Sequence, residues 1–124
     1  MPSAELHSKQ ARHNKKFLNE KVFDPKKFLY PDWYVTACFY YTLHLIDGKL
    51  ALMNGAYEHI SEHKVRNNLI EASFKKTKYA EVIDLYGTLR IYSQTARYAC
   101  VKINKYTVQK ATECMSRIEQ LLSS

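Results

Sequence analysis

The hydrophobic pattern of this chain is dominated by one mostly apolar run from Pro31 to Leu52. A helix over this run would carry apolar residues almost all the way around, with no Lys or Arg before Lys49. A helix that is hydrophobic on every side is buried among other elements. The run therefore predicts the central helix of a bundle. Truncations such as Trp33→Ala and Leu43→Ala are then expected to cost about 2–5 kcal/mol, as large-to-small core changes do.

Helical spacing of apolar residues predicts four further helices. They cover Ser3 to about Val22, Ser61 to Ala72, Tyr79 to Lys102, and Thr107 to Leu122. The expected N-caps of the helices are Ser3, Asp32, Ser61 and Thr107. No segment alternates with a period of two, so strands are not predicted. The predicted fold is all-α, an antiparallel bundle of four main helices plus a short fifth helix.

The length of 124 residues predicts a single helical domain, 1–124, in which residues 1–30 form a basic N-terminal helix and linker. The net charge of +7 favours anionic partners such as nucleic acid or nucleotides. Three cysteines (Cys38, Cys100 and Cys114) form an odd number without CxxC spacing. This usage predicts reduced thiols, and residues 1–27 show no apolar signal segment, so a cytoplasmic location is expected. Polar residues inside the 31–52 run argue against a membrane span.

A polar cluster surrounds His59 and His63. The two are four residues apart, a metal-ligand spacing, but no HExxH frame accompanies them and His59 is expected in a loop, so no metal site is predicted. His63 and Arg66 lie three apart at a predicted helix start. Arg66 can hold a phosphate and His63 can transfer a proton near neutral pH. The alternative, two solvated surface residues, stays equally open.

Two further positions carry candidate chemistry. Tyr41 and His44 share a face of the central helix and form either part of a pocket or a hydrogen-bonded core pair. Near the end of the fourth helix, Ser93, Arg97 and Tyr98 accompany small residues, and this grouping predicts an anion-binding corner. The alternative there is an exposed helical arginine.

Several site types are excluded by their missing motifs. The chain has no nucleophile elbow, no Gly-rich phosphate loop and no paired-carboxylate motif. It also lacks the short Gly turn of a helix-turn-helix. No cofactor is expected.

With these residues in view, residues 31–122 resemble the HEPN family (higher eukaryotes and prokaryotes nucleotide-binding domains), in particular small stand-alone prokaryotic members. The matching features, in chain order, are Asp32-Trp33, Tyr40-Tyr41, His44, His63, Arg66, Tyr86, Leu89, Ser93, Ala96-Arg97-Tyr98 and the last helix. The resemblance implies a helical homodimer that binds RNA or a nucleotide. It also implies a toxin–antitoxin or defence setting with an operon-encoded protein partner.

Active members of that family carry an arginine followed, after four to six residues, by a histidine. Here Arg97 is the candidate arginine, but no histidine follows it at that spacing. The metal-independent ribonuclease chemistry then requires His63 or His44 to supply the imidazole from another helix, while Arg97 stabilises the phosphate. The favoured interpretation is a module that binds RNA or a nucleotide, with Arg66, Arg97, Tyr98, Tyr41 and Ser93 as ligand contacts. The alternatives are the ribonuclease and a protein-interaction scaffold.

Overall fold

The computed structural model describes residues 3–20, 30–54 and 63–123. Those residues form helices and their connections, without a strand. The helices are α1 (Ala4–Leu18), α2 (Pro31–Asn54), α3 (His63–Phe74), α4 (Glu81–Tyr98) and α5 (Lys105–Leu122). The prediction of an all-α fold is confirmed.

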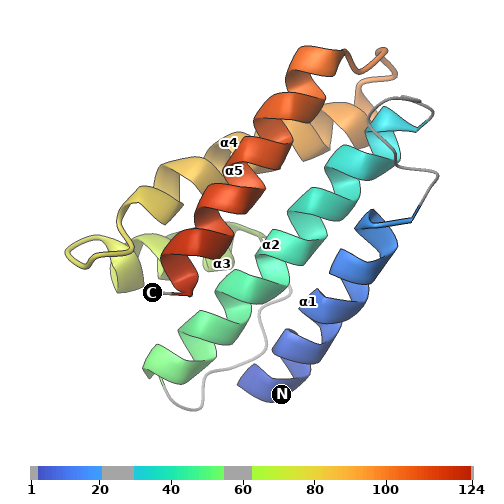
Figure 1. Cartoon of the computed structure of the whole chain (residues 1–124). Helices are drawn as coiled ribbons and strands as arrows, with labels where there is room; N and C mark the ends of the chain where they lie inside the picture. The colour runs from blue at the N-terminus through green and yellow to red at the C-terminus, as the bar shows by residue number, and fades with distance from the viewer. Residues whose placement is uncertain (1–2, 21–29, 55–62, 124) are drawn as a thin grey trace.

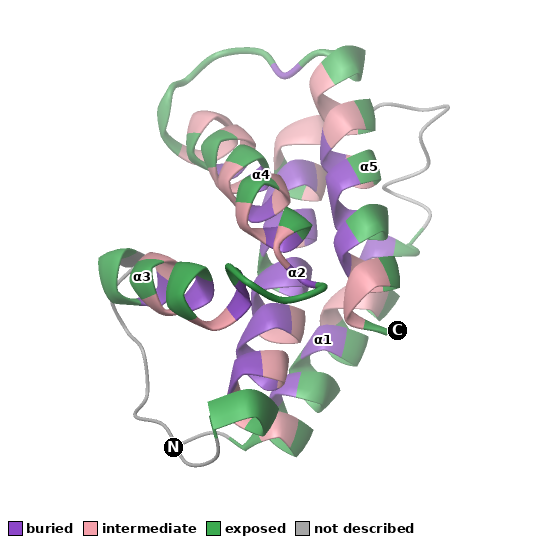
Figure 2. Ribbon diagram, turned by 90° about the vertical axis from the view of Figure 1, so that its left-hand side faces the viewer, coloured by how far each residue is buried: buried purple, intermediate pink, exposed green. Residues whose placement is uncertain are grey.

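The four longer helices form an antiparallel bundle (Figure 1). α1 and α4 run in one direction, and α2 and α5 run in the other. α3, with 12 residues, is the shortest of the described helices and lies across the bundle in Figure 2. α2 packs against α1, α4 and α5 and also touches α3. It is therefore the central helix that its apolar pattern predicts.

Burial along α2 explains its central place. Its buried residues include Val35, Tyr41, Leu43, Asp47 and Gly48, which at 3.6 residues per turn lie on different sides of the helix. α5, by contrast, buries a single stripe that contains Ala111, Cys114, Met115 and Ile118. Such one-sided helices cover a core, whereas α2 supplies its middle.

Trp33 is a correction to the predicted core. Its side chain is 60% exposed, whereas that of Leu43 is 6% exposed. Trp33 belongs to the first turn of α2. The expectation that Trp33→Ala removes core packing is wrong, and the same expectation for Leu43 agrees with its burial.

The N-terminal caps agree with the prediction at one helix and differ at two others. The Ser3 hydroxyl accepts a hydrogen bond from the Leu6 backbone N–H at 3.2 Å, as predicted. α2 begins at Pro31, whose missing N–H suits the first helical position, so Asp32 lies within the first turn. α5 is capped by Asn104, whose side-chain oxygen accepts from the Thr107 N–H at 2.8 Å. The predicted cap Ser61 lies outside the described residues.

The sequence predictions extended α1 and α4 too far at their C-terminal ends. α1 ends at Leu18 and not near Val22, while α4 ends at Tyr98 and not at Lys102. Just after α4, Cys100 has a φ of 54°, a left-handed conformation that a helix cannot continue through. Cys100 is consequently exposed outside a helix, whereas Cys38 and Cys114 are buried.

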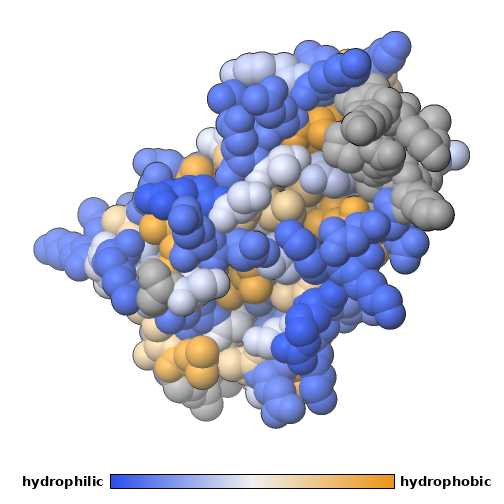
Figure 3. Space-filling view, viewed as in Figure 1, coloured by the Kyte–Doolittle hydropathy of each residue, from blue (hydrophilic) through white to orange (hydrophobic). Residues whose placement is uncertain are grey.

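The face in Figure 3 is hydrophilic over most of its area, especially along α1. Apolar residues show mainly between α1 and α5, where α2 lies. Among the described helices, none is both long and apolar enough to cross a membrane.

Candidate functional site

Arg66 and Asp47 form a buried ion pair between α3 and α2. Arg66 Nε donates to Asp47 Oδ1 at 3.0 Å and Arg66 Nη2 donates to Asp47 Oδ2 at 3.2 Å. Arg66 is 6% exposed and Asp47 is 4% exposed. Burial of a charged group demands such a partner. The geometry therefore favours a structural role for Arg66, fastening α3 to α2, over the predicted phosphate contact.

His44 contacts a second histidine, His7 of α1, which was not among the predicted site residues. His44 Nδ1 lies 3.1 Å from His7 Nδ1 of α1, so one of these nitrogens donates a hydrogen bond and the other accepts it. Burial lowers the pKa of His44, and so does the charge that His7 would carry, while Asp47 opposes the shift. His44 is therefore a neutral imidazole at neutral pH. The available signal for His7 was its spacing, because Ala11 and Leu18 follow it by four and eleven residues and share its face of α1.

Acidification should destabilise the protein through His44. Its folded-state pKa lies below the unfolded value of about 6.5, so the unfolded chain binds a proton more readily. The stability from neutral His44 is fully present above about pH 6.5 and is lost as the pH falls toward the lower folded-state pKa. Urea unfolding between about pH 7.5 and pH 5.5 measures this loss. His44→Gln should lose less stability across the range, and an unchanged pH dependence in that variant would contradict the assignment.

Tyr41 does not join His44 in a pocket. Its hydroxyl hydrogen-bonds to Glu119 of α5, and Lys15 Nζ lies 3.5 Å from Glu119 Oε2 and 5.2 Å from the centre of the Tyr41 ring. Burial and the neighbouring Glu119 carboxylate raise the pKa of Tyr41. Tyr41 is a hydrogen-bonded packing residue, but its partner is Glu119 and that of His44 is His7, so the predicted hydrogen-bonded pair of Tyr41 and His44 is not formed.

Arg97 forms a corner with two tyrosines, Tyr40 of α2 and Tyr98 of its own helix. Arg97 Nη1 donates to the Tyr40 hydroxyl at 2.9 Å, and its guanidinium carbon lies 5.5 Å from the Tyr40 ring centre and 5.0 Å from that of Tyr98. Tyr98 is 72% exposed. None of the ion pairs between described residues includes Arg97. We call Arg97, Tyr40 and Tyr98 the Arg97 corner.

The remaining predicted residues stand apart from this corner or support it from within. Ser93 supplies its backbone oxygen to Arg97 Nε at 3.3 Å. Its side chain is fully buried, however, so a direct ligand contact by the Ser93 hydroxyl is not favoured. His63 is the first residue of α3, and its side chain is not among those the structure describes. His59 lies outside the described residues.

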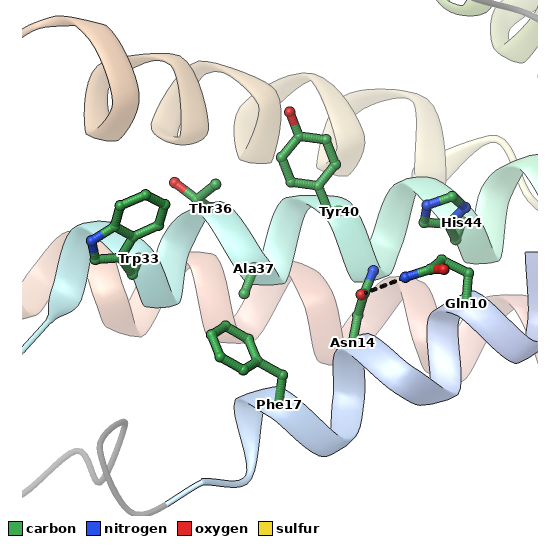
Figure 4. A pocket seen from close by; sticks show the side chains of 8 residues that line it. All are labelled: Gln10, Asn14, Phe17, Trp33, Thr36, Ala37, Tyr40 and His44. Atoms are coloured by element: carbon green, nitrogen blue, oxygen red, sulfur yellow. Dashed lines mark hydrogen bonds between the residues drawn. The ribbon is translucent and has the colours of Figure 1, made fainter.

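Tyr40 and His44 line a cavity of about 390 Å³ between α1 and α2 (Figure 4). The other lining residues are Gln10, Asn14, Phe17, Trp33, Thr36 and Ala37. A second cavity of about 530 Å³ lies beside it and also contains Gln10 and His44. We call the two cavities together the α1–α2 groove. The volume of each cavity falls in the range of small-molecule binding sites.

The described part of the chain holds no group of three or more His, Cys, Asp or Glu side chains placed to bind a metal ion. Comparison with protein-family models, curated proteins and solved structures gives no match to the chain. Functional inference accordingly rests on the geometry of the Arg97 corner and the α1–α2 groove.

Proposed function

We propose that this chain is a HEPN-like helical module that binds RNA or its nucleotides at the Arg97 corner. One observation carries the proposal: a guanidinium without a carboxylate partner among the described residues lies 5.5 Å and 5.0 Å from the centres of two tyrosine rings. Arginine forms charge-assisted hydrogen bonds with phosphate oxygens. Unpaired bases stack on aromatic rings and on guanidinium planes, and this favours single-stranded RNA over a duplex.

The overall charge supports the same class of ligand. A net charge of +7 attracts polyanions and speeds their association. The proposal includes the homodimer and the toxin–antitoxin or defence setting that the HEPN resemblance implies.

Arg97→Ala should weaken RNA binding about tenfold to a hundredfold. A hydrogen bond to a charged group is worth about 1.5–3 kcal/mol, and each 1.4 kcal/mol is a factor of ten in affinity. Fluorescence anisotropy of a labelled single-stranded RNA measures the dissociation constant at low and moderate salt. Binding by the unaltered protein should weaken steeply with salt, because phosphate contacts release counterions.

Lys76→Ala is the matched control, because it removes the same charge from an exposed residue beyond the opposite end of α4. An affinity that drops equally in Lys76→Ala and Arg97→Ala would show only a loss of net charge. That result, or a dissociation constant for RNA that does not change with salt concentration, would overturn the proposal.

A ribonuclease is the second candidate, and one contact favours it. Tyr40 accepts the hydrogen bond from Arg97 and also lines the cavity that contains His44. A phosphate-stabilising group and a neutral imidazole therefore approach the same groove, as proton transfer at a phosphodiester requires. Electrophoresis of the RNA from the same samples, with a chelator present, reads out this activity. Cleavage that disappears in both Arg97→Ala and His44→Ala would assign it, and intact RNA would leave a binding module.

A further inference from the structure

A second arginine of α4, Arg90, lies on the same side of the helix as Arg97. The two residues are seven positions apart, close to two full turns, so their side chains leave the helix in nearly the same direction, about 10 Å apart along its axis. Gln94 lies between them on this side and is exposed, and both arginines are partly exposed. We call Arg90, Gln94 and Arg97 the α4 stripe.

The two arginines of the α4 stripe have no carboxylate partner among the described residues. Neither Arg90 nor Arg97 takes part in an ion pair there. On α4, no Asp or Glu stands three or four positions before or after either arginine, so no neighbour on their helix face offsets the charge. Asp47 lies near Tyr86, as Arg90 does, but it already holds Arg66 through two hydrogen bonds. The stripe therefore keeps both of its positive charges.

The two guanidinium groups extend in the same direction. Helical side chains lean toward the N-terminus of their helix. Arg97 does so, because its Nε donates to the Ser93 backbone oxygen at 3.3 Å, one turn earlier. Burial raises the pKa of Tyr86 and the charge of Arg90 opposes that rise, so Arg90 also lies close to the residue one turn before it. Parallel side chains keep the spacing of about 10 Å at their charged ends.

Two cations about 10 Å apart along a helix suit a strand better than a single nucleotide. Phosphates of a stacked strand follow one another about every 3.4 Å along its axis, so Arg90 and Arg97 match phosphates about three nucleotides apart. Arginine binds phosphate oxygens through charge-assisted hydrogen bonds. The exposed amide of Gln94 lies between them and both donates and accepts hydrogen bonds. A ligand with one phosphate would reach only one of the two arginines.

We propose that the α4 stripe binds the backbone of a single-stranded RNA, with one phosphate on Arg97 and another on Arg90 about three nucleotides along. The inference rests on the proposed function, because the strand enters the stripe at the Arg97 corner. It names the ligand of that corner as a strand and not a free nucleotide. Affinity should consequently depend on Arg90 only when the RNA is long enough to reach it.

Arg90→Ala should raise the dissociation constant of octaadenylate about tenfold, because a charge-assisted hydrogen bond is lost. It should leave unchanged that of the dinucleotide ApA, which carries one phosphate. Both RNAs lack terminal phosphates and compete with fluorescein-labelled octaadenylate in an anisotropy assay. An unchanged dissociation constant for octaadenylate would overturn the inference. Equal weakening of both RNAs would also overturn it, because Arg90 and Arg97 would then share one phosphate.

The salt dependence of octaadenylate binding counts the phosphate contacts. For single strands, each contact contributes about 0.7 to the slope of log K against log salt concentration, so Arg90→Ala and Arg97→Ala should each lower the slope by about that amount. Arg12→Ala is the matched control, since Arg12 is an exposed arginine of α1 that lines neither cavity of the α1–α2 groove. A slope that falls equally in Arg12→Ala would reduce the effect to net charge and contradict the inference.

Two further variants show whether the charge of Arg90 or the fold causes the effect. Arg90→Gln removes the charge but keeps a long polar side chain, and it should weaken octaadenylate binding as Arg90→Ala does. Arg90→Lys restores the charge and should restore much of the affinity. Thermal melting identifies the variants that are folded. Weak binding by a folded Arg90→Lys, equal to that of Arg90→Gln, would contradict a phosphate contact by this residue.

Arg97→Ala separates this inference from the proposed function. It should weaken the binding of both ApA and octaadenylate. Binding that depends on Arg97 but not on Arg90 would retain the proposed function and overturn the α4 stripe. Binding of octaadenylate that depends on Arg90 but not on Arg97 would overturn both the corner and a strand that contacts the two arginines.

Discussion

Asp47→Ala should destabilise the protein by about 3–5 kcal/mol, among the largest effects that a single substitution can have in this chain. Removing one partner of a buried ion pair leaves the other charge without compensation. Here the remaining group would be the Arg66 guanidinium, which is 6% exposed and makes two hydrogen bonds to Asp47. Urea unfolding followed by circular dichroism measures the change in the free energy of unfolding.

A double variant shows whether the lost pairing causes the effect. Asp47→Leu combined with Arg66→Met replaces both charges with apolar side chains, a change that is often neutral or stabilising for buried pairs. We expect this double variant to be more stable than Asp47→Ala. If Asp47→Ala unfolds with the same free energy as the unaltered protein, the ion pair does not fasten α3 to α2.

Leu43→Ala should cost about 2–5 kcal/mol, whereas Trp33→Ala should cost less than about 1 kcal/mol. Both residues belong to α2, and the larger side chain is the one expected to matter less. Leu43 is 6% exposed and its truncation leaves a cavity in the core, while Trp33 is 60% exposed. Thermal melting and urea unfolding of the two variants side by side measure the difference. Equal costs, or a larger cost for Trp33→Ala, would contradict the burial of α2 described here.

The fold was largely predictable because its strongest signal is a single helix. A helix over Pro31 to Leu52 carries apolar residues on too many sides to lie at the surface of the bundle. Each of the other helices carries a single apolar stripe. Helix ends were less predictable, since several polar residues at each end compete as caps. Asn104 and Thr107 are both good candidates, and only the geometry of the first turn selects Asn104.

The candidate site was less predictable because helical spacing does not distinguish close neighbours. Residues three and four positions apart both share a helix face, so Tyr40 and Tyr41 fit His44 almost equally well. Packing against Glu119 draws Tyr41 toward α5 and leaves Tyr40 beside Arg97. Nothing local to the sequence specifies contacts with another helix.

The sequence contains an indication that an arginine such as Arg66 forms a buried ion pair. Asp47 is a carboxylate inside an otherwise apolar helix, and a buried charge of this kind needs a partner. The pattern alone does not name which cation supplies it, because Arg66 lies 19 residues away on another helix. Arg97 has no carboxylate partner among the described residues, so it is the arginine that we propose binds an external phosphate.

The most direct test of this account is the binding of a labelled single-stranded RNA to the unaltered protein, Arg97→Ala and Lys76→Ala at two salt concentrations. The account predicts salt-sensitive binding that Arg97→Ala weakens about tenfold or more and that Lys76→Ala leaves nearly unchanged. Absent binding, or equal binding by all three proteins, would contradict a nucleic-acid role for the Arg97 corner.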